Sequence, residues 1–261
     1  MSSSGERRKL VLISGATGGI GKATAIAFAK EGGYDLAMHY NTASDEVREK
    51  LTESMTNHNR EEDFRFHFFQ ADIGNYDSVR KLHREVVETL GPVDILFNNA
   101  GSACGHTSVQ SLADVPIDVA EETWRINTGS GILLTQLCLP HMEAQNWGRV
   151  IFDSSVAAFT GGVVGPHYAS SKSAQHGFIH WLAGNVAKKG ITVNGVAPAL
   201  IGDTNMMGSS DDKEVQERVA SRIPVGRLGR PEEVADTVLW MAKNAYVTNK
   251  VIAIDGGYYP Y

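Results

Sequence analysis

Residues 10–29 read LVLISGATGGIGKATAIAFA, and this stretch decides the fold. Leu10 to Ser14 is a short apolar run typical of a buried strand, and a helical pattern, Ile20 to Glu31, follows a glycine-rich turn. Such a turn can bring bare backbone N–H groups against a phosphate, whose charge the helix N-terminus favours. We expect three glycines to hold the pyrophosphate of a dinucleotide: Gly15, Gly19 and Gly21.

The same alternation of strand and helix continues along the chain, which predicts an α/β fold with a parallel sheet. The predicted strands are Leu10–Ser14, Asp35–His39, Arg65–Phe69, Val93–Asn98, Arg149–Asp153, Thr192–Ala197 and Val251–Asp255. The predicted helices are Ile20–Glu31, Ser44–Asn57, Tyr76–Leu90, Val119–His141, Tyr168–Lys188 and Pro231–Lys243. Right-handed crossovers place the carboxyl ends of all the strands at one edge, where we expect the chemistry.

Composition indicates one domain over residues 1–261, because no break in composition interrupts the pattern. The net charge is -6 with both signs interspersed, so we expect no nucleic-acid partner. No apolar run is long enough to cross a bilayer, and the basic N-terminus lacks the apolar stretch of a signal peptide. The two cysteines, Cys104 and Cys138, have no metal or redox spacing. We therefore expect a cytoplasmic protein, away from membranes, with free thiols.

Two long segments, Ser102–Asp118 and Ala199–Ser221, follow strand ends and are either walls of a substrate site or disordered loops. His176 and His180 lie one helical turn apart, as a zinc pair would, but Gly177 stands where a metalloprotease has its Glu. We interpret them as helix-surface histidines and expect no metal.

The motif that points to a reaction is Tyr168-Ala169-Ser170-Ser171-Lys172 at the start of a predicted helix, preceded by Ser154-Ser155 after the fifth strand. Residues four apart share a helix face, so Lys172 can lie beside Tyr168. A neighbouring ammonium favours the phenolate, so we expect Lys172 to lower the pKa of Tyr168 and make it a usable acid or base. The Ser155 hydroxyl, with Ser154 as competitor, could bind a substrate oxygen.

The second predicted strand ends in His39-Tyr40-Asn41-Thr42, where a carboxylate would bind the ribose diol of NAD and repel a 2′-phosphate. Tyr40 takes that place, and Asn41 and Thr42 can donate to phosphate oxygens. This pattern predicts NADPH as the preferred cofactor, with NAD possible because no arginine is evident at this strand end.

The T/S-G-x-x-x-G-x-G turn and the Tyr-x-x-x-Lys motif resemble the short-chain dehydrogenase/reductase family, and further motifs extend the resemblance over nearly the whole chain. These are Asn98-Asn99-Ala100-Gly101, Trp124-Arg125-Ile126-Asn127, Ala71-Asp72-Ile73, Asn194-Gly195-Val196-Ala197-Pro198 and Ile254-Asp255-Gly256-Gly257. The resemblance implies a Rossmann-like doubly wound parallel sheet of about seven strands with helices on both faces.

The resemblance also implies the roles of single residues. Within the family, Asn127 would hold a water in a proton relay to Lys172, and Asp72 would contact adenine, unless these side chains bind local backbone or cap a helix. The family's Ser-to-Tyr separation selects Ser155. The resemblance adds to the predicted cofactor contacts Thr17, Ile20, Ile73, Asn99, Ala100, Gly101, Tyr168, Lys172, Pro198 and Ile201.

Within the family, the chain looks similar to NADPH-dependent ketoreductases of the 3-oxoacyl-acyl-carrier-protein reductase type. We expect hydride transfer from NADPH to a small-molecule carbonyl or acyl substrate, with Tyr168 as general acid. Two alternatives remain: NAD-dependent oxidation of a secondary alcohol by the same residues, and a scaffold or sensor that binds a dinucleotide without catalysis. Family members commonly assemble as homotetramers, so the resemblance implies a homo-oligomer, either tetramer or dimer.

Overall fold

The computed structural model describes residues 7–202 and 220–259, and within them seven parallel strands form one sheet. The strand order is β3-β2-β1-β4-β5-β6-β7, so the winding direction reverses between β1 and β4. The strands are β1 (Lys9–Ile13), β2 (Tyr34–Tyr40), β3 (Phe66–Gln70), β4 (Ile95–Asn98), β5 (Gly148–Asp153), β6 (Ile191–Pro198) and β7 (Lys250–Ile254). The predicted Rossmann-like sheet is confirmed, and open sheets of this kind bind ligands where the order reverses.

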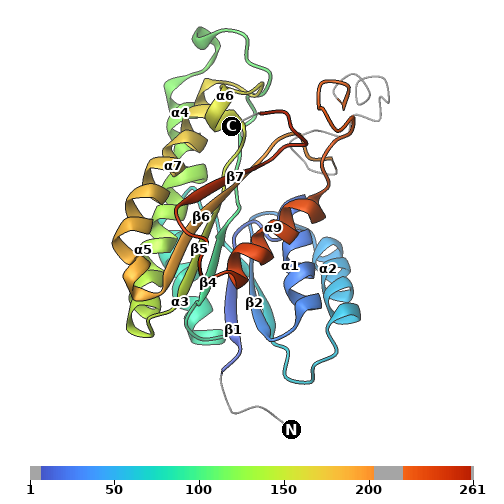
Figure 1. Ribbon diagram of the computed structural model, residues 1–261, viewed down its shortest axis with the longest axis vertical. Coiled ribbons are helices and arrows are strands. Elements are labelled where there is room, and N and C mark those ends of the chain that lie inside the picture. The colour runs from blue at the N-terminus through green and yellow to red at the C-terminus, as the bar shows by residue number, and fades with distance from the viewer. Residues whose placement is uncertain (1–6, 203–219, 260–261) are drawn as a thin grey trace.

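Helices cover both faces of the sheet (Figure 1). One face carries α1 (Gly19–Glu31), α2 (Asp45–His58) and α9 (Pro231–Lys243). The other carries α3 (Tyr76–Thr89), α5 (Ser130–Ala144) and α7 (Pro166–Val186). The shorter elements are η1 (Leu112–Asp114), α4 (Ile117–Trp124), η2 (Arg125–Gly129), α6 (Ala157–Thr160) and η3 (Ala187–Lys189).

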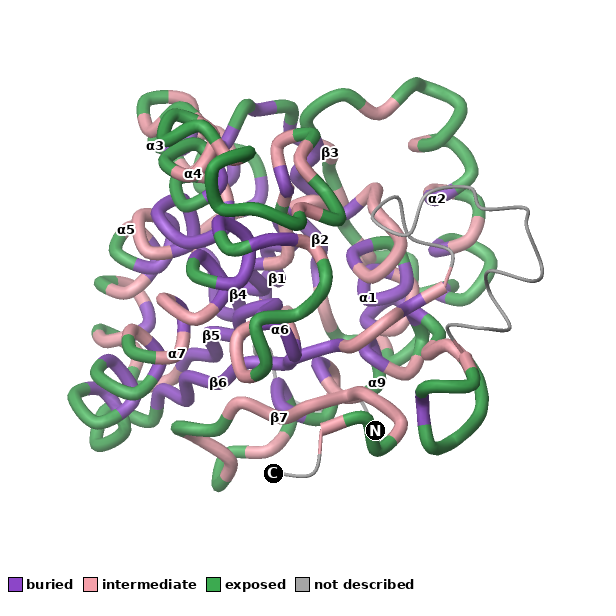
Figure 2. The backbone as a smooth tube through the Cα atoms, turned by 90° about the horizontal axis from the view of Figure 1, so that it is seen from above, coloured by how far each residue is buried: buried purple, intermediate pink, exposed green. Residues whose placement is uncertain are grey.

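The core lies between the sheet and each helical layer, because alternate strand residues face opposite sides. On β1, Leu10 and Leu12 pack toward α3, α5 and α7, whereas Val11 and Ile13 pack toward α1, α2 and α9. The inner strands β1, β2, β4, β5 and β6 consequently form the buried centre of the molecule in Figure 2, whereas the edge strands β3 and β7 are only partly buried. Burial on both faces explains why the strands are apolar runs without a polar side.

The structure corrects one predicted helix. Val119–His141 was expected to be continuous, but α4 begins at Ile117, a π-helical segment (η2) interrupts the helix at Arg125–Gly129, and α5 ends at Ala144. A π segment adds a residue to a turn, which shifts the side chains that follow and is frequent at functional sites.

Two further expectations concern loops and membranes. The first long segment contains the 3-10 turn η1, and most of the second, residues 203–219, lies outside the described residues. In the part of the chain that the structure describes, no helix combines the length and apolar character needed to cross a bilayer.

Candidate active site

The glycine-rich turn joins β1 to α1 at the carboxyl edge of the sheet. Gly15 adopts a φ of +66°, which L side chains rarely take. At Gly21 an added Cβ would lie 2.2 Å from the Gly15 carbonyl oxygen, so only hydrogen fits there. Gly18, the N-cap of α1, provides no side-chain acceptor for the first helical N–H groups. Gly19, the first helical residue, therefore begins a helix whose exposed donors suit a phosphate.

The end of β4 holds this turn in place. The Ser14 hydroxyl accepts hydrogen bonds from the backbone N–H groups of Asn99 and Ala100, at 2.9 and 3.0 Å. The Asn99 amide in turn donates to the carbonyl oxygens of Ser14 and Gly15, at 2.8 and 3.1 Å. These hydrogen bonds fix the turn to the end of β4, next to the point where the strand order reverses, and the geometry of the turn fits the pyrophosphate of a dinucleotide.

Tyr168, Ser155 and Lys172 are brought together as the sequence predicts. Tyr168, on the first turn of α7, is 5% exposed, and its hydroxyl hydrogen-bonds with Ser155. Lys172 lies one turn later, 2% exposed, with its Nζ 5.7 Å from the centre of the Tyr168 ring. The Lys172 ammonium donates to the Asp153 carbonyl oxygen at the end of β5. Ser154, the competing serine, instead contacts the ring nitrogen Nε2 of His176 at 2.8 Å.

From the sequence, Lys172 is expected to lower the pKa of Tyr168, and in this structure that expectation is wrong. Burial raises the pKa of Tyr168 far above its usual value, and the negative charge of Asp153 raises it further. Its hydrogen bond with Ser155 lowers the pKa of Tyr168, but less than burial raises it. Lys172 does not reverse this because its ammonium lies over the ring and beside Asp153, and burial lowers the pKa of Lys172 itself. Tyr168 therefore holds its proton at neutral pH.

Asn127 lies in the π segment η2 and reaches the same region. Its side-chain oxygen accepts from the Ser102 N–H at 2.7 Å, and its amide donates to the Ser102 carbonyl and the Ser171 hydroxyl at 3.0 and 2.9 Å. A Cβ added to Gly101 would lie 3.3 Å from both Asn127 Oδ1 and Lys172 Nζ. Asn127 and Lys172 therefore flank the Gly101 backbone, as expected for residues of one site.

The end of β2 presents the predicted adenosine-side residues. Tyr40 is 8% exposed, with its ring edge-on to Phe68, whereas Asn41 and Thr42 are exposed. Asp72 Oδ1 accepts the Gly74 N–H at 2.9 Å, so part of the carboxylate is bound locally. The cap of α3 is not Asp72 but Asn75, whose side chain accepts from two helical N–H groups.

The remaining predicted contacts are distributed around this edge. Thr17 and Ile20 are half-buried, Ile20 packing on the α1 side, whereas the Ile73 side chain is 5% exposed and packs in the opposite core. At the end of β6 the Pro198 carbonyl accepts the Val156 N–H at 3.0 Å. Ile201 is 4% exposed and its backbone bridges to Gly229. The Ile73 side chain therefore lies in the core, and a cofactor contact at this residue stays a prediction for its backbone alone.

Comparison with known proteins identifies this arrangement. A sequence model of the short chain dehydrogenase family matches residues 9–215. The chain belongs to this family. Its relatives include an uncharacterized oxidoreductase, YmfI, of Bacillus subtilis (36% identical, covering 96% of this chain and 99% of the relative). Others are an L-rhamnose 1-dehydrogenase (NAD(P)(+)) of Sphingomonas (31%, covering 96% of both chains) and a 3-oxoacyl-[acyl-carrier-protein] reductase of Thermotoga maritima (34%, covering 95% and 97%).

The family resemblance predicted from the motifs is thus confirmed, and this short-chain dehydrogenase is an oxidoreductase that uses a nicotinamide dinucleotide. The uncapped N-terminus of α1 and the glycine positions that exclude a Cβ fit the pyrophosphate of that cofactor.

Sequence reasoning missed two residues of this short-chain dehydrogenase. His39 is 1% exposed, and its ring joins the Gly15 N–H to the Ala71 carbonyl, each at 3.0 Å. Arg48, on α2, places its guanidinium 4.7 Å from the centre of the Tyr40 ring and pairs with Asp45. Its position eight residues after Tyr40, at the start of the next helix, was the available signal for an arginine near this strand end.

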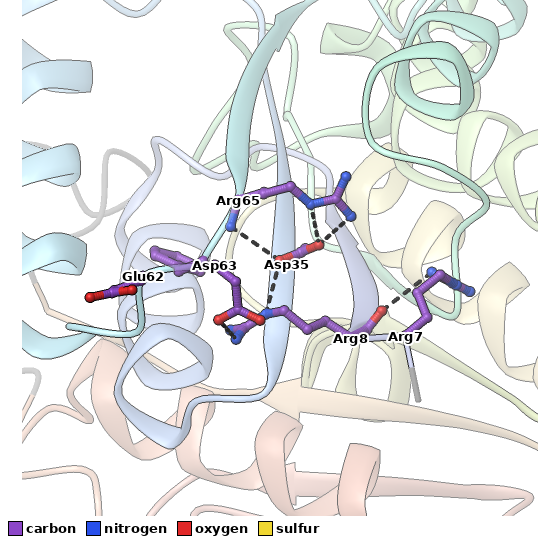
Figure 3. Close-up of a pocket in the computed structure, with 7 residues that line it drawn as sticks. Arg7, Arg8, Asp35, Glu62, Asp63 and Arg65 are labelled. Atoms are coloured by element: carbon purple, nitrogen blue, oxygen red, sulfur yellow. Dashed lines mark hydrogen bonds and ion pairs between the residues drawn. The ribbon is translucent and has the colours of Figure 1, made fainter. Parts of the chain in front are cut away.

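A separate charged pocket lies at the opposite, amino edge of the sheet (Figure 3). Arg8 and Arg65 both pair there with Asp35, whose side chain is fully buried, and Arg8 also pairs with Asp63. These charges neutralise one another and are far along the strands from Tyr168. Within residues 7–202 and 220–259, no group of three or more histidine, cysteine, aspartate or glutamate side chains is arranged to hold a metal.

Proposed function

We propose that this short-chain dehydrogenase reduces a ketone to a secondary alcohol with NADPH, and that a 3-oxoacyl thioester is one class of substrate. The observation that carries the proposal is the buried Tyr168, which keeps its proton and shares a hydrogen bond with Ser155 at the carboxyl edge of the sheet. A protonated tyrosine beside a hydroxyl is suited to binding a carbonyl oxygen and protonating it. The relatives that are 3-oxoacyl-[acyl-carrier-protein] reductases support the substrate class.

When bound, the reduced nicotinamide supplies the hydride that the carbonyl carbon accepts. Ser155 donates a hydrogen bond that orients the carbonyl oxygen, and Tyr168 transfers its proton to that oxygen as the C–O bond becomes single. Lys172, with its ammonium 5.7 Å from the centre of the Tyr168 ring, then stabilises the phenolate that remains. Asn127, across Gly101 from Lys172, provides the relay that returns a proton from solvent.

Substitution Tyr168→Phe tests this mechanism. The variant keeps the ring but removes the proton donor, so turnover should fall at least about 100-fold, the typical contribution of general acid catalysis, with NADPH binding nearly unchanged. The assay follows NADPH consumption with an acetoacetyl thioester, a cyclic ketone and a 1,2-diketone, and NADPH binding by fluorescence titration. Phe159→Leu, which alters an aromatic residue with no proposed role, is the control. Retained turnover in Tyr168→Phe would exclude the mechanism.

A second candidate is oxidation of a secondary alcohol with the same residues. The relatives named as L-rhamnose 1-dehydrogenases favour it, because they share the fold over nearly their whole length. Reduction of NADP by L-rhamnose and other sugars, measured beside the ketone panel, decides between the two directions. Activity in either direction also excludes a scaffold without catalysis.

The NADPH preference is proposed from the adenosine side of the site. Tyr40 replaces the carboxylate that would repel a 2′-phosphate, and Arg48 brings a cation within 4.7 Å of the Tyr40 ring. The side chain of Arg48 is 28% exposed, and its buried Nε has no hydrogen-bond partner among the described residues, so the guanidinium has unused donors.

We predict a higher kcat/KM with NADPH than with NADH, and a preference reduced about tenfold in Arg48→Gln, as loss of one charge-assisted hydrogen bond would cause. Arg80→Gln is the matched control, because Arg80 pairs with Asp77 across the same three-residue spacing on α3. Equal kcat/KM values for the two cofactors would contradict the proposed preference.

A further inference from the structure

Asp153 is a buried carboxylate that neither the sequence patterns nor the proposed mechanism uses. It is the last residue of β5, directly before Ser154 and Ser155, and it is 9% exposed. The preceding strand residues Ile151 and Phe152 are fully buried apolar side chains, as expected at the centre of a parallel sheet. A charged side chain at this position is costly to bury and requires a compensating partner.

The partner is Lys172. Asp153 Oδ2 lies 3.9 Å from Lys172 Nζ, and the same ammonium donates to the Asp153 backbone carbonyl. Asp153 Oδ1 has no hydrogen-bond partner among the described residues. Within residues 7–202 and 220–259, no hydrogen bond holds Oδ1 in place, and the charged contact of this carboxylate is with Lys172 of the proposed active site.

The groups that act electrostatically on this carboxylate come from α7. Lys172 is its counter-charge, and Tyr168 is affected by the Asp153 charge. Beside it in the sheet, β6 opposes Asp153 with Val196, and β4 ends at Asn98 and is followed by Asn99, none of which titrates. Lys172 thus contacts Asp153 directly, and Tyr168, whose ring centre lies 5.7 Å from Lys172 Nζ, is affected by the same negative charge.

We propose that Asp153 is a positioning residue of this site, whose carboxylate is the counter-charge that keeps the buried Lys172 protonated and holds the proton on Tyr168. The expected effect on ketone reduction rests on the proposed function, whereas the expected effect on the protonation of Lys172 does not. A fixed negative charge favours the protonated form of any neighbour, so removing it should make both Lys172 and Tyr168 lose their protons more readily.

The directions of the three pKa values agree with this. Burial lowers the pKa of Lys172, and the Asp153 charge opposes that change. Burial raises the pKa of Asp153 to about 6, and the Lys172 charge limits the rise. The counter-charge is therefore present at neutral pH and disappears when Asp153 is protonated in mild acid.

The first experiment measures the titration of Lys172 and does not depend on enzyme activity. The full-length protein is labelled with ¹³C at lysine Cε, and the Lys172 NMR signal is assigned by its loss in Lys172→Met. In Asp153→Asn, which keeps the shape and removes the charge, the Lys172 signal should titrate about one pH unit lower than in the parent protein. The parent Lys172 signal should also respond to a second titration near pH 6, as Asp153 is protonated.

Two variants accompany it. Asp153→Ser removes the carboxylate by shortening the side chain and should give the same lowered Lys172 titration. Asp236→Asn makes the same chemical change at an exposed position of α9 and should leave the Lys172 titration unchanged. Circular dichroism shows that each variant is folded. An identical Lys172 titration in the parent and both Asp153 variants would overturn the inference.

The second experiment measures the pH profile of ketone reduction with NADPH, using the fastest ketone of the panel above. Reduction requires the proton on Tyr168, so activity falls at high pH, and in Asp153→Asn this basic limb should lie about one pH unit lower. At pH values below this limb, where Tyr168 is protonated in both proteins, the two profiles should converge. Parallel profiles at all pH values would overturn the inference, whereas active Tyr168→Phe would overturn the proposed function alone.

Discussion

At the scale of single residues, His39 explains how the glycine-rich turn keeps its shape. The Gly15 N–H donates to His39 Nδ1, so the ring proton must be on Nε2, which donates to the Ala71 carbonyl. Burial lowers the pKa of His39, which keeps the ring neutral and this pair of hydrogen bonds intact. The imidazole thereby joins the turn after β1 to the end of β3 across β2.

Substitution His39→Leu should destabilise the fold by about 1–3 kcal/mol, because the Gly15 N–H and the Ala71 carbonyl lose their partner. NADPH affinity should fall with it, since Gly15 begins the turn that we expect to hold the pyrophosphate. Urea unfolding and fluorescence titration measure the two effects, and His58→Leu, at an exposed position of α2, is the control. Unchanged stability would contradict the role assigned to His39.

The same residue gives a pH dependence with a defined sign. The pKa of His39 in the folded protein lies below its usual value of 6.5, so the unfolded chain binds this proton more readily. His39 therefore lowers the stability of the fold as pH falls below about 6.5, and His39→Leu should make the free energy of unfolding less dependent on pH in that range.

At the scale of elements, the sequence predicted all seven strands and the six long helical stretches, with ends within a few residues. The prediction succeeded because strands buried on both faces are apolar runs, as in β5, whereas helices such as α3 show one apolar stripe. However, the spacing of apolar residues along a helix does not reveal the single extra residue that a π-helical turn contains. The π segment around Asn127 therefore could not be separated from its flanking helices α4 and α5.

The candidate site was predictable where motif and geometry coincide, as for Tyr168 and Lys172 one turn apart on α7. It was not predictable where a contact depends on how separate elements pack. Arg48 meets Tyr40 only because α2 folds back beside β2, and Asp153 meets Lys172 only because α7 crosses the end of β5. The predicted lowering of the Tyr168 pKa was wrong for the same reason, because the burial that raises this pKa cannot be judged from sequence spacing alone.

At the scale of the whole molecule, the layer that contains α4, α5 and α7 carries exposed apolar side chains. Trp181 on α7 is 66% exposed, Ile117 and Trp124 on α4 are 71% and 43% exposed, and Leu112 just before α4 is 75% exposed. This layer lies on the side of the sheet away from α1, α2 and α9 (Figure 1). Trp240 on α9 and Val47 on α2 are also exposed on the other side of the sheet, but the four side chains named here are more numerous, which favours this layer as an interaction surface.

We propose that this layer joins two copies of the chain, in the homo-oligomer that the family resemblance implies. Size-exclusion chromatography with light scattering should then give a mass two or four times that of the 28.2 kDa chain. Trp181→Glu places a charge at the contact, which an apolar interface cannot pair, so the mass should fall toward that of the monomer. Val47→Glu, at an exposed apolar position of α2, should leave the mass unchanged. A parent protein that elutes as a monomer would refute the assembly, and a Trp181→Glu variant of unchanged mass would place the contact on another face.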